Sequence, residues 1–314
     1  MTEPLIELSN VSRWYGEVIG INRVTVVVRP GITGLLGPNG AGKSTMMNLI
    51  TGMLRPSQGD VSVYGKEVWG NISLMERLGY CMQADSFFGR MTARQFIQSL
   101  LELRGWMQSR ARAASVHALE QLNMAGAMDR RIDGYSKGMR QRVKVALAIA
   151  HNPEILVLDE PLNGLDAVGR HEMIELIRRF GREGRNVVIS SHVLHEIESM
   201  TNNILMMSGG YLLAEGDVRE VRESLSRHPH RVLVRCTEPR AAAVFLLEQP
   251  STISAKVEEL DHAVVVETRD IARFYDALNI LVLDRGADVS LVTVSDENIS
   301  SIFDYLGKSG GKSA

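Results

Sequence analysis

A glycine-rich loop between an apolar run and a helical pattern is the first stretch that predicts chemistry. The loop, residues 37–45, has the sequence GPNGAGKST and matches the pattern G-x-x-x-x-G-K-[ST]. Glycines at this spacing let backbone N–H groups surround an anion, aided by the positive end of the following helix. In such loops the lysine spans two phosphates and the next hydroxyl binds Mg²⁺. The predicted nucleotide phosphate site, called the phosphate loop below, consists of Gly37, Pro38, Asn39, Gly40, Ala41, Gly42, Lys43, Ser44 and Thr45.

Two carboxylates end an apolar run further along the chain. The run ILVL is followed by Asp159 and Glu160, and such a run is typical of a strand buried on both faces of a parallel sheet. Asp159 at the strand end is suited to the Mg²⁺ shell, and Glu160 is suited to polarise an attacking water as a general base. An isolated Asp-Glu pair also fits a helix cap or a surface ion pair. The phosphate loop upstream favours the catalytic interpretation.

Strand and helix patterns alternate around these residues, which predicts an α/β fold with a parallel sheet. Residues 203–216 are typical of a hairpin that turns on Gly209-Gly210, and between 84 and 150 the pattern is helical. The predicted strands are 5–11, 24–31, 31–37, 60–65, 78–83, 154–161 and 186–190. The predicted helices are 44–54, 92–105, 109–124, 138–151 and 170–184.

A second, smaller pattern follows the polar stretch at 224–231. Its order of strand, helix, two strands, helix, strand and a last helix fits a ferredoxin-like α+β domain. We therefore predict a first domain at 1–226 and a C-terminal accessory domain at 227–314, whose tail GKSGGKSA we expect to be mobile. The predicted elements are strands 231–236, 253–260, 263–268 and 288–294 and helices 239–248, 270–280 and 296–306.

Composition narrows the class of protein. The chain has 314 residues, 45% of them hydrophobic, and a net charge of −2, which is typical of an ordinary globular protein and gives no general attraction to nucleic acid. Cys81 and Cys236 form no CxxC pair, which favours a reducing compartment over a disulfide framework or zinc site. No signal peptide pattern is present, and no apolar run approaches the roughly 20 residues that a membrane helix needs. We expect any membrane role to come through a partner.

Five motifs occur in one order and at compatible spacing, namely GPNGAGKST, YSKGMRQRV, ILVLDEP, NGLD and SSH. Over residues 4–220 the sequence resembles the nucleotide-binding subunit of an ABC transporter. The resemblance implies a P-loop NTPase domain with a RecA-like core around the parallel sheet, an antiparallel β subdomain and a helical subdomain at about 84–150. It also implies ATP and Mg²⁺ as ligands, with Lys43, Glu160 and His192 as catalytic residues. The implied metal-binding residues are Ser44, Gln83 and Asp159.

The signature segment, residues 135–139 with the sequence YSKGM, corresponds by resemblance to the motif that contacts ATP held by the other subunit of a head-to-tail dimer. Ser136 and the Gly138 amide precede an amphipathic helix, so they lie at its positive end. Ser136 also fits a plain helix cap. The segment departs from the commonest form, LSGGQ, at three positions, and its YSKGM form resembles that of exporter subunits that pair with a separate membrane protein.

Four further roles are implied by the resemblance. Tyr15 corresponds to the aromatic residue that stacks on adenine, and Gln83 to the glutamine that senses magnesium and the membrane partner. Asp166 belongs to the loop that communicates across the dimer. His192 corresponds to the histidine that contacts the γ-phosphate and helps Glu160 to position the water. Each of these residues taken alone also fits a structural role, such as a packing aromatic or a helix cap.

The resemblance predicts the ATP-hydrolysing motor subunit of an ABC transporter, with export favoured over import. Two ATPase subunits, in a homodimer or a heterodimer, form the sites, and a separate transmembrane permease holds them at the cytoplasmic face of the membrane. A soluble ABC-type ATPase in mechanical or regulatory work is the alternative. A sensor that does not hydrolyse ATP is opposed by the presence of Glu160 and His192.

Overall fold

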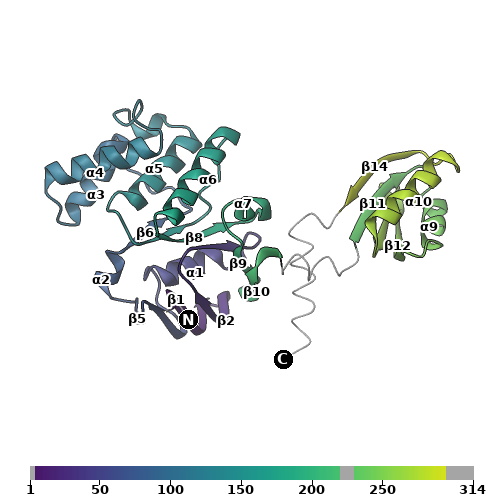
Figure 1. Ribbon diagram of the computed structural model, residues 1–314, viewed down its shortest axis with the longest axis horizontal. Helices are drawn as coiled ribbons and strands as arrows, with labels where there is room; N and C mark the ends of the chain where they lie inside the picture. Colours follow the sequence, from purple (N-terminus) through teal and green to yellow (C-terminus); the bar gives the residue numbers. More distant parts are fainter. Residues whose placement is uncertain (1–3, 220–229, 295–314) are drawn as a thin grey trace. The chain divides into compact units, whose positions relative to one another are not determined.

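The computed structural model describes residues 4–219 and 230–294 (Figure 1). Contacts divide the chain into two compact units, Met1–Asp217 and Val218–Ala314, which are described separately. The boundary predicted at 226–227, the last predicted helix at 296–306 and the tail lie outside the described residues.

A six-stranded sheet forms the centre of the first unit. Its strand order is β10-β9-β3-β8-β7-β6, and its neighbours are parallel except for the β9–β10 hairpin. The hairpin turns on Gly209 and Gly210, both with positive φ, as a two-residue turn with the twist of the flanking strands requires. The strands are β3 (Ile32–Leu36), β6 (Leu78–Cys81), β7 (Ile155–Leu158), β8 (Asn186–Ser191), β9 (Asn203–Ser208) and β10 (Tyr211–Asp217).

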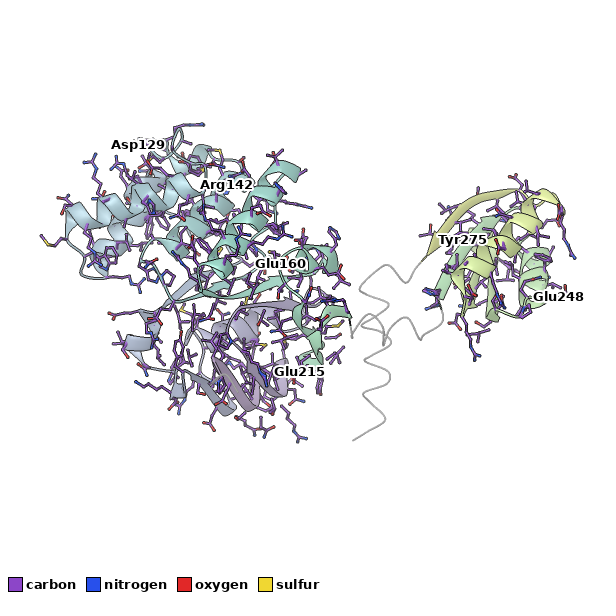
Figure 2. All side chains as sticks on the ribbon, in the orientation of Figure 1. Asp129, Arg142, Glu160, Glu215, Glu248 and Tyr275 are labelled. Carbon is purple, nitrogen blue, oxygen red and sulfur yellow. The ribbon has the colours of Figure 1, made fainter. Side chains whose placement is uncertain are left out.

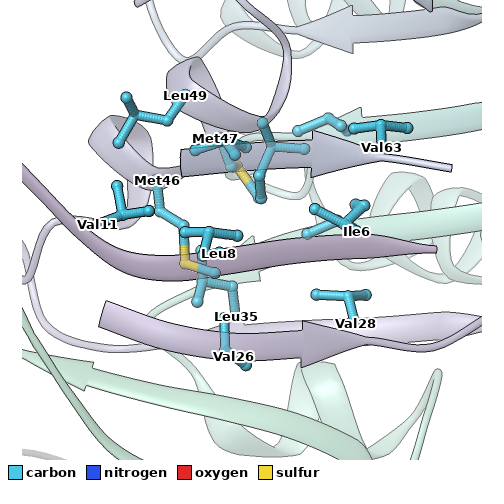
Figure 3. Close-up of a cluster of buried hydrophobic side chains, with 14 of the residues drawn as sticks. Ile6, Leu8, Val11, Val26, Val28, Leu35, Met46, Met47, Leu49 and Val63 are labelled. Carbon is cyan, nitrogen blue, oxygen red and sulfur yellow. The ribbon is translucent and has the colours of Figure 1, made fainter. Parts of the chain in front are cut away.

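An antiparallel sheet of order β2-β1-β4-β5 forms a second layer. Helix α1 (Lys43–Ile50) lies between the two sheets, and its buried methionines and leucine contact apolar residues of both, as Figure 3 shows. The strands are β1 (Ile6–Tyr15), β2 (Val18–Val28), β4 (Gln58–Val63) and β5 (Lys66–Glu67). β1 and β2 extend beyond the predicted strands because antiparallel pairing continues through polar residues to Tyr15 and Val18.

Helices cover the other side of the six-stranded sheet (Figure 1). α3 begins with a capping box between Thr92 and Gln95 and packs against α4. These helices are α3 (Ala93–Leu103), α4 (Gln108–Gln121), α5 (Lys137–Ile149), α6 (Ala167–Arg182) and α7 (Leu194–Glu198). The short helix α2 (Ile72–Met75) instead buries Leu74 in the apolar cluster between the two sheets. Sequence periodicity missed α2 and α7 because each is too short to show a repeating apolar face. Helix α1 ends at Ile50 rather than at the predicted residue 54, because Gly52 adopts a φ of 72°.

The second unit has the predicted βαββαβ order, and its sheet has the order β12-β13-β11-β14 with antiparallel neighbours. This arrangement confirms the ferredoxin-like α+β fold. Buried Val232, Val264 and Val266 of the sheet pack against Phe245 and Phe274 of the helices. The elements are β11 (His230–Cys236), α9 (Pro239–Leu247), β12 (Thr252–Glu258), β13 (Ala263–Thr268), α10 (Ile271–Leu283) and β14 (Val289–Val294).

Candidate nucleotide-binding and hydrolysis site

The phosphate loop connects β3 to α1 and depends on its glycines. Gly40 and Gly42 have φ angles of 81° and 102°, which L side chains rarely adopt. A Cβ on Gly42 would lie 2.5 Å from the Gly20 carbonyl oxygen, and one on Gly37 would lie 2.4 Å from the Met207 carbonyl oxygen. Gly42 is the N-cap of α1 and provides no side-chain cap. The start of α1 therefore suits an anion that accepts hydrogen bonds from its N–H groups.

Lys43 points back into the phosphate loop. Its ammonium group donates hydrogen bonds to the carbonyl oxygens of Gly37 (2.6 Å) and Pro38 (3.0 Å). It also lies 3.5 Å from Glu160 Oε1, and both side chains are buried. The loop thus holds a buried positive charge beside a buried carboxylate, at the place where the sequence predicts phosphates.

Asp159 and Glu160 follow β7 and are fixed by Ser190 of the neighbouring strand β8. The Ser190 hydroxyl donates to Asp159 Oδ1 at 2.6 Å and accepts from the Glu160 backbone N–H at 2.8 Å. Asp159 is buried, with an exposed fraction of 1%. Ser190 belongs to the SSH motif, but the sequence predicted no role for it. In the sequence, the one sign of this role is that Ser190 is a polar residue near the end of an otherwise apolar strand.

Glu160 joins two other predicted residues. Its Oε2 lies 3.0 Å from His192 Nδ1, while its Oε1 faces Lys43. Among the described residues, this buried Oε1 has no hydrogen-bond partner. Buried polar atoms in proteins are normally hydrogen-bonded, so Oε1 suits a water or substrate atom that supplies the missing bond. Glu160 lies where the six-stranded sheet meets the helices (Figure 2).

Tyr15 lies at the end of β1 beside the start of α1. Its ring is 44% exposed, and its hydroxyl lies 3.4 Å from Thr45 Oγ1. The Arg13 guanidinium lies over the ring at 5.2 Å from its centroid. Gly20 makes room for the ring, since a Cβ there would lie 2.8 Å from Tyr15 Cε2. The exposed aromatic ring beside the phosphate loop is suited to stack on a nucleobase. Nothing in the sequence indicated that Tyr15 requires a glycine at position 20.

Comparisons with known proteins show the family of the chain. The ABC transporter family matches residues 21–163. Over 318 residues, covering 98% of each chain, the sequence is 30% identical to the bacitracin transport ATP-binding protein BcrA of Enterococcus faecalis. The chain belongs to the ABC transporter ATP-binding proteins. It is an ATPase of this family.

Two other similarities each cover part of this ABC ATPase. Over 227 residues it is 32% identical to the ABC transporter ATP-binding protein NatA of Bacillus subtilis, covering 70% of this chain and 92% of NatA. The dimeric structure of MJ0796, a bacterial ABC transporter cassette, superposes with a TM-score of 0.64 at 23% identity, over 68% of this chain and 99% of that chain. The similarity to MJ0796 shows that the two proteins share a fold.

The signature segment and Asp166 lie at helix starts in the ABC ATPase. The Ser136 hydroxyl caps α5 by accepting from the Met139 N–H at 3.2 Å. Asp166 caps α6 by accepting from the Gly169 N–H at 2.8 Å. A Cβ on Gly138 would lie 3.1 Å from the Gly164 carbonyl oxygen. Ser136 and Asp166 therefore both act as helix caps, which is the structural alternative given for each of them above. A contact to ATP would be an additional role.

Gln83 follows β6 and is exposed. Its backbone carbonyl oxygen accepts a hydrogen bond from Lys144 of α5 at 2.7 Å. Because β6 and β7 are parallel neighbours, with Cys81 opposite Leu158, Gln83 follows the strand next to the one that ends before Asp159. Burial raises the pKa of the Cys81 thiol to about 12, so the thiol stays protonated at neutral pH.

In the described part of the chain, no three histidine, cysteine or acidic side chains gather as a metal site. A magnesium ion in a nucleotide site needs few protein ligands, because phosphate oxygens and waters supply the rest. Ser44 and Asp159 carry the kinds of oxygen, a hydroxyl and a carboxylate, that such an ion takes from the protein. None of the described helices has the length and apolar character needed to span a membrane.

Proposed function

We propose that this ABC ATPase hydrolyses MgATP at sites shared between two ATPase subunits and thereby drives a separate transmembrane permease, in the direction of export. The observation that carries the proposal is Glu160, whose two oxygens face Lys43 and His192. The oxygen on the Lys43 side has no hydrogen-bond partner among the described residues. A carboxylate held in this way beside the phosphate loop supports the role of general base.

The phosphate loop and its neighbours hold the nucleotide in this proposal. Backbone N–H groups of residues 37–45 and the Lys43 ammonium bind phosphate oxygens, and Tyr15 stacks on the adenine. Ser44, Asp159 and Gln83 hold Mg²⁺ directly or through water. When bound, Mg²⁺ neutralises charge on the phosphate oxygens. The Ser190 hydroxyl keeps the Asp159 carboxylate oriented through the hydrogen bond at 2.6 Å.

Glu160 accepts the proton of the water that attacks the terminal phosphate. His192 lies 3.0 Å from the same carboxylate, so it orients Glu160. The exposed side of the His192 ring contacts the phosphate. Lys43 has three N–H donors and uses two of them on the Gly37 and Pro38 carbonyl oxygens, so it must release one of these bonds when it spans two phosphates. A phosphate oxygen is the stronger, charged acceptor.

A second subunit completes each site. Ser136 and Gly138 at the start of α5 contact the terminal phosphate of ATP bound to the other subunit, and Asp166 lies at the interface between them. ATP then stabilises the closed dimer through contacts that are absent once the phosphate leaves. The dimeric arrangement of MJ0796 supports this step.

The relatives favour transport over soluble mechanical work. BcrA is a bacitracin transport protein, and a further relative at 28% identity is the daunorubicin/doxorubicin resistance ATP-binding protein DrrA of Streptomyces peucetius. These names connect such ATPases with transport and with drug resistance, which favours export. The YSKGM form of the signature segment favours the same direction. We place the chain at the cytoplasmic face of the membrane. Its permease docks at residues 84–134, where Phe88 is 66% exposed.

Replacement of the proposed base tests the mechanism. Glu160→Gln keeps the shape of the side chain but cannot accept a proton, so we expect hydrolysis to fall by about 100-fold or more, with ATP binding retained. The variant should elute as an ATP-dependent dimer in size-exclusion chromatography. Lys43→Ala is the matched variant that should weaken binding itself. Normal hydrolysis by Glu160→Gln would contradict the assignment of the base.

Purification from detergent-solubilised membranes separates transport from soluble work. The full-length tagged chain should retain a multi-spanning membrane protein in stoichiometric amount, and this partner should stimulate the hydrolysis of ATP. Recovery of the chain from the soluble fraction alone, with full activity and no such partner, would favour the soluble ABC-type ATPase.

A further inference from the structure

The Asp85 carboxylate lies between the segment that follows Gln83 and helix α5. Its Oδ2 accepts a hydrogen bond from Arg140 Nε at 2.9 Å, and its Oδ1 lies 3.1 Å from Lys144 Nζ. Arg140 and Lys144 are four residues apart on α5 and therefore share one face of the helix. One carboxylate thus contacts two cations of the helix that begins at the signature segment.

Lys144 and Arg140 also donate hydrogen bonds to main-chain carbonyl oxygens. Lys144 Nζ donates to the Gln83 carbonyl oxygen at 2.7 Å, and Arg140 Nη1 donates to the Tyr135 carbonyl oxygen at 2.6 Å. Tyr135 immediately precedes Ser136. The backbone at Gln83 and the backbone before Ser136 are therefore joined through Lys144, Asp85 and Arg140.

The same segment is also held on α3. The rings of Phe87 and Phe88 contact Phe96 edge to face, with centroids 5.3 and 6.0 Å apart. Lys144 is nearly buried, with an exposed fraction of 9%, while the Arg140 side chain is 32% exposed. A nearly buried ammonium that loses its carboxylate partner is destabilised more than an exposed one. The Asp85 side chain is itself 43% exposed, so it is the burial of Lys144 that makes this ion pair resist separation of the segment from α5.

We propose that Asp85 is a positioning residue that couples Gln83 of one site to Ser136, which serves the site of the neighbouring subunit. This inference rests on the proposed function. A displacement of the Gln83 segment pulls on Asp85, shifts Arg140 and moves the start of α5. Asp85 touches no nucleotide in this role, so its loss uncouples the two segments without emptying the phosphate loop.

The test compares Asp85→Asn with Asp129→Asn in the full-length chain. Asp129 also pairs with an arginine of the helical region, Arg94 at 2.6 Å, but its side chain is 65% exposed and it lies apart from Glu160 (Figure 2). For Asp85→Asn we expect an unchanged dissociation constant for a fluorescent ATP analogue and a kcat lowered by about fivefold or more. Asp129→Asn should change neither quantity.

Amide hydrogen exchange distinguishes coupling of the two segments from a purely local role of Asp85. Asp85→Asn should raise exchange both at 82–88 and at 135–139, while Asp85→Glu, which keeps the charge, should restore part of the protection. Arg140→Gln should show the same pattern at both segments, and the double variant should be less than additive. Faster exchange at 82–88 alone, with kcat unchanged, would overturn the inference.

Ser136→Ala separates this inference from the proposed function. If Ser136→Ala hydrolyses ATP like the original chain, the role of the signature segment is wrong, and the exchange measurement still decides whether Asp85 couples the two segments. If Ser136→Ala is inactive while Asp85→Asn retains full kcat, the proposed function stands and the coupling is wrong.

Discussion

At the scale of the residue, Glu160 has a strained backbone that its neighbours hold in place. Its φ of 49° lies in the left-handed region, which costs a non-glycine residue about 1–3 kcal/mol. The strained backbone is held by a hydrogen bond from Glu160 N–H to Ser190 and one from Gln141 Nε2 to the Glu160 carbonyl oxygen at 3.4 Å. Such strain persists where the surrounding structure fixes it, and here it aims the carboxylate at Lys43 and His192.

His151 gives a residue-scale prediction about pH. Burial lowers the pKa of His151 to about 4, and the Arg104 charge acts in the same direction. The ring is therefore neutral in the folded chain down to about pH 4, but it binds a proton near pH 6.5 once unfolded. Because the unfolded state binds more protons in this interval, the free energy of unfolding falls as the pH drops from about 6.5 to 4.

Replacement of His151 by glutamine should flatten this dependence. We expect the loss of stability between pH 7 and 5 to shrink by about 1 kcal/mol, after allowance for solvent screening of a partly exposed ring. Urea unfolding followed by tryptophan fluorescence measures it, since Trp14, Trp69 and Trp106 all belong to the first unit. The exposed His117→Gln is the matched control. An unchanged slope in His151→Gln would contradict the prediction.

At the scale of the element, the site exists because parallel strands end at one edge of a sheet. β7 and β8 are hydrogen-bonded neighbours, with Leu158 opposite Ile189. The carboxyl ends of the two strands therefore lie side by side, which brings Asp159 and Glu160 against Ser190 at the end of β8 and His192 just after it. The phosphate loop follows β3, the other neighbour of β8, so Lys43 reaches the same place.

Ser190→Ala tests the connection between β7 and β8. The change removes the donor to Asp159 and the acceptor of the Glu160 N–H, which leaves two buried polar groups each short of one partner. We expect a loss of about 1–3 kcal/mol in the free energy of unfolding and a lowered kcat, because Glu160 is no longer held. Urea unfolding and ATPase assays measure both effects, with the exposed Ser73→Ala as control. Wild-type values for both would show that Ser190 is not the connecting group.

At the scale of the whole molecule, the chain combines an ATP-binding unit with a ferredoxin-like unit. The match to NatA covers 92% of that protein but 70% of this chain, whereas the match to BcrA covers 98% of both. The family match at residues 21–163 falls within the first unit, whereas the match to BcrA takes in the second, added unit as well. We propose that the added unit stabilises the dimer or modulates its opening.

Removal of residues 231–314 tests the independence of the first unit. The nucleotide-site residues discussed here, from Tyr15 to His192, all belong to Met1–Asp217. We therefore expect the shortened chain to bind a fluorescent ATP analogue with a dissociation constant within about threefold of the original, a change below 1 kcal/mol. A change in ATP-dependent dimer formation would assign the removed unit its role. Loss of binding would mean that the first unit needs residues beyond 230.

The sequence by itself determined the local parts of this protein. The phosphate loop, the βαββαβ order and the caps Ser136 and Asp166 depend on residues that are neighbours along the chain, so spacing alone predicts them. Only the tertiary structure decided which distant groups meet, such as Ser190 with Asp159, Gly20 with Tyr15 and Asp85 with Arg140. Those pairs depend on strand order, register and the packing of helices, which the pattern of a single strand or helix does not specify.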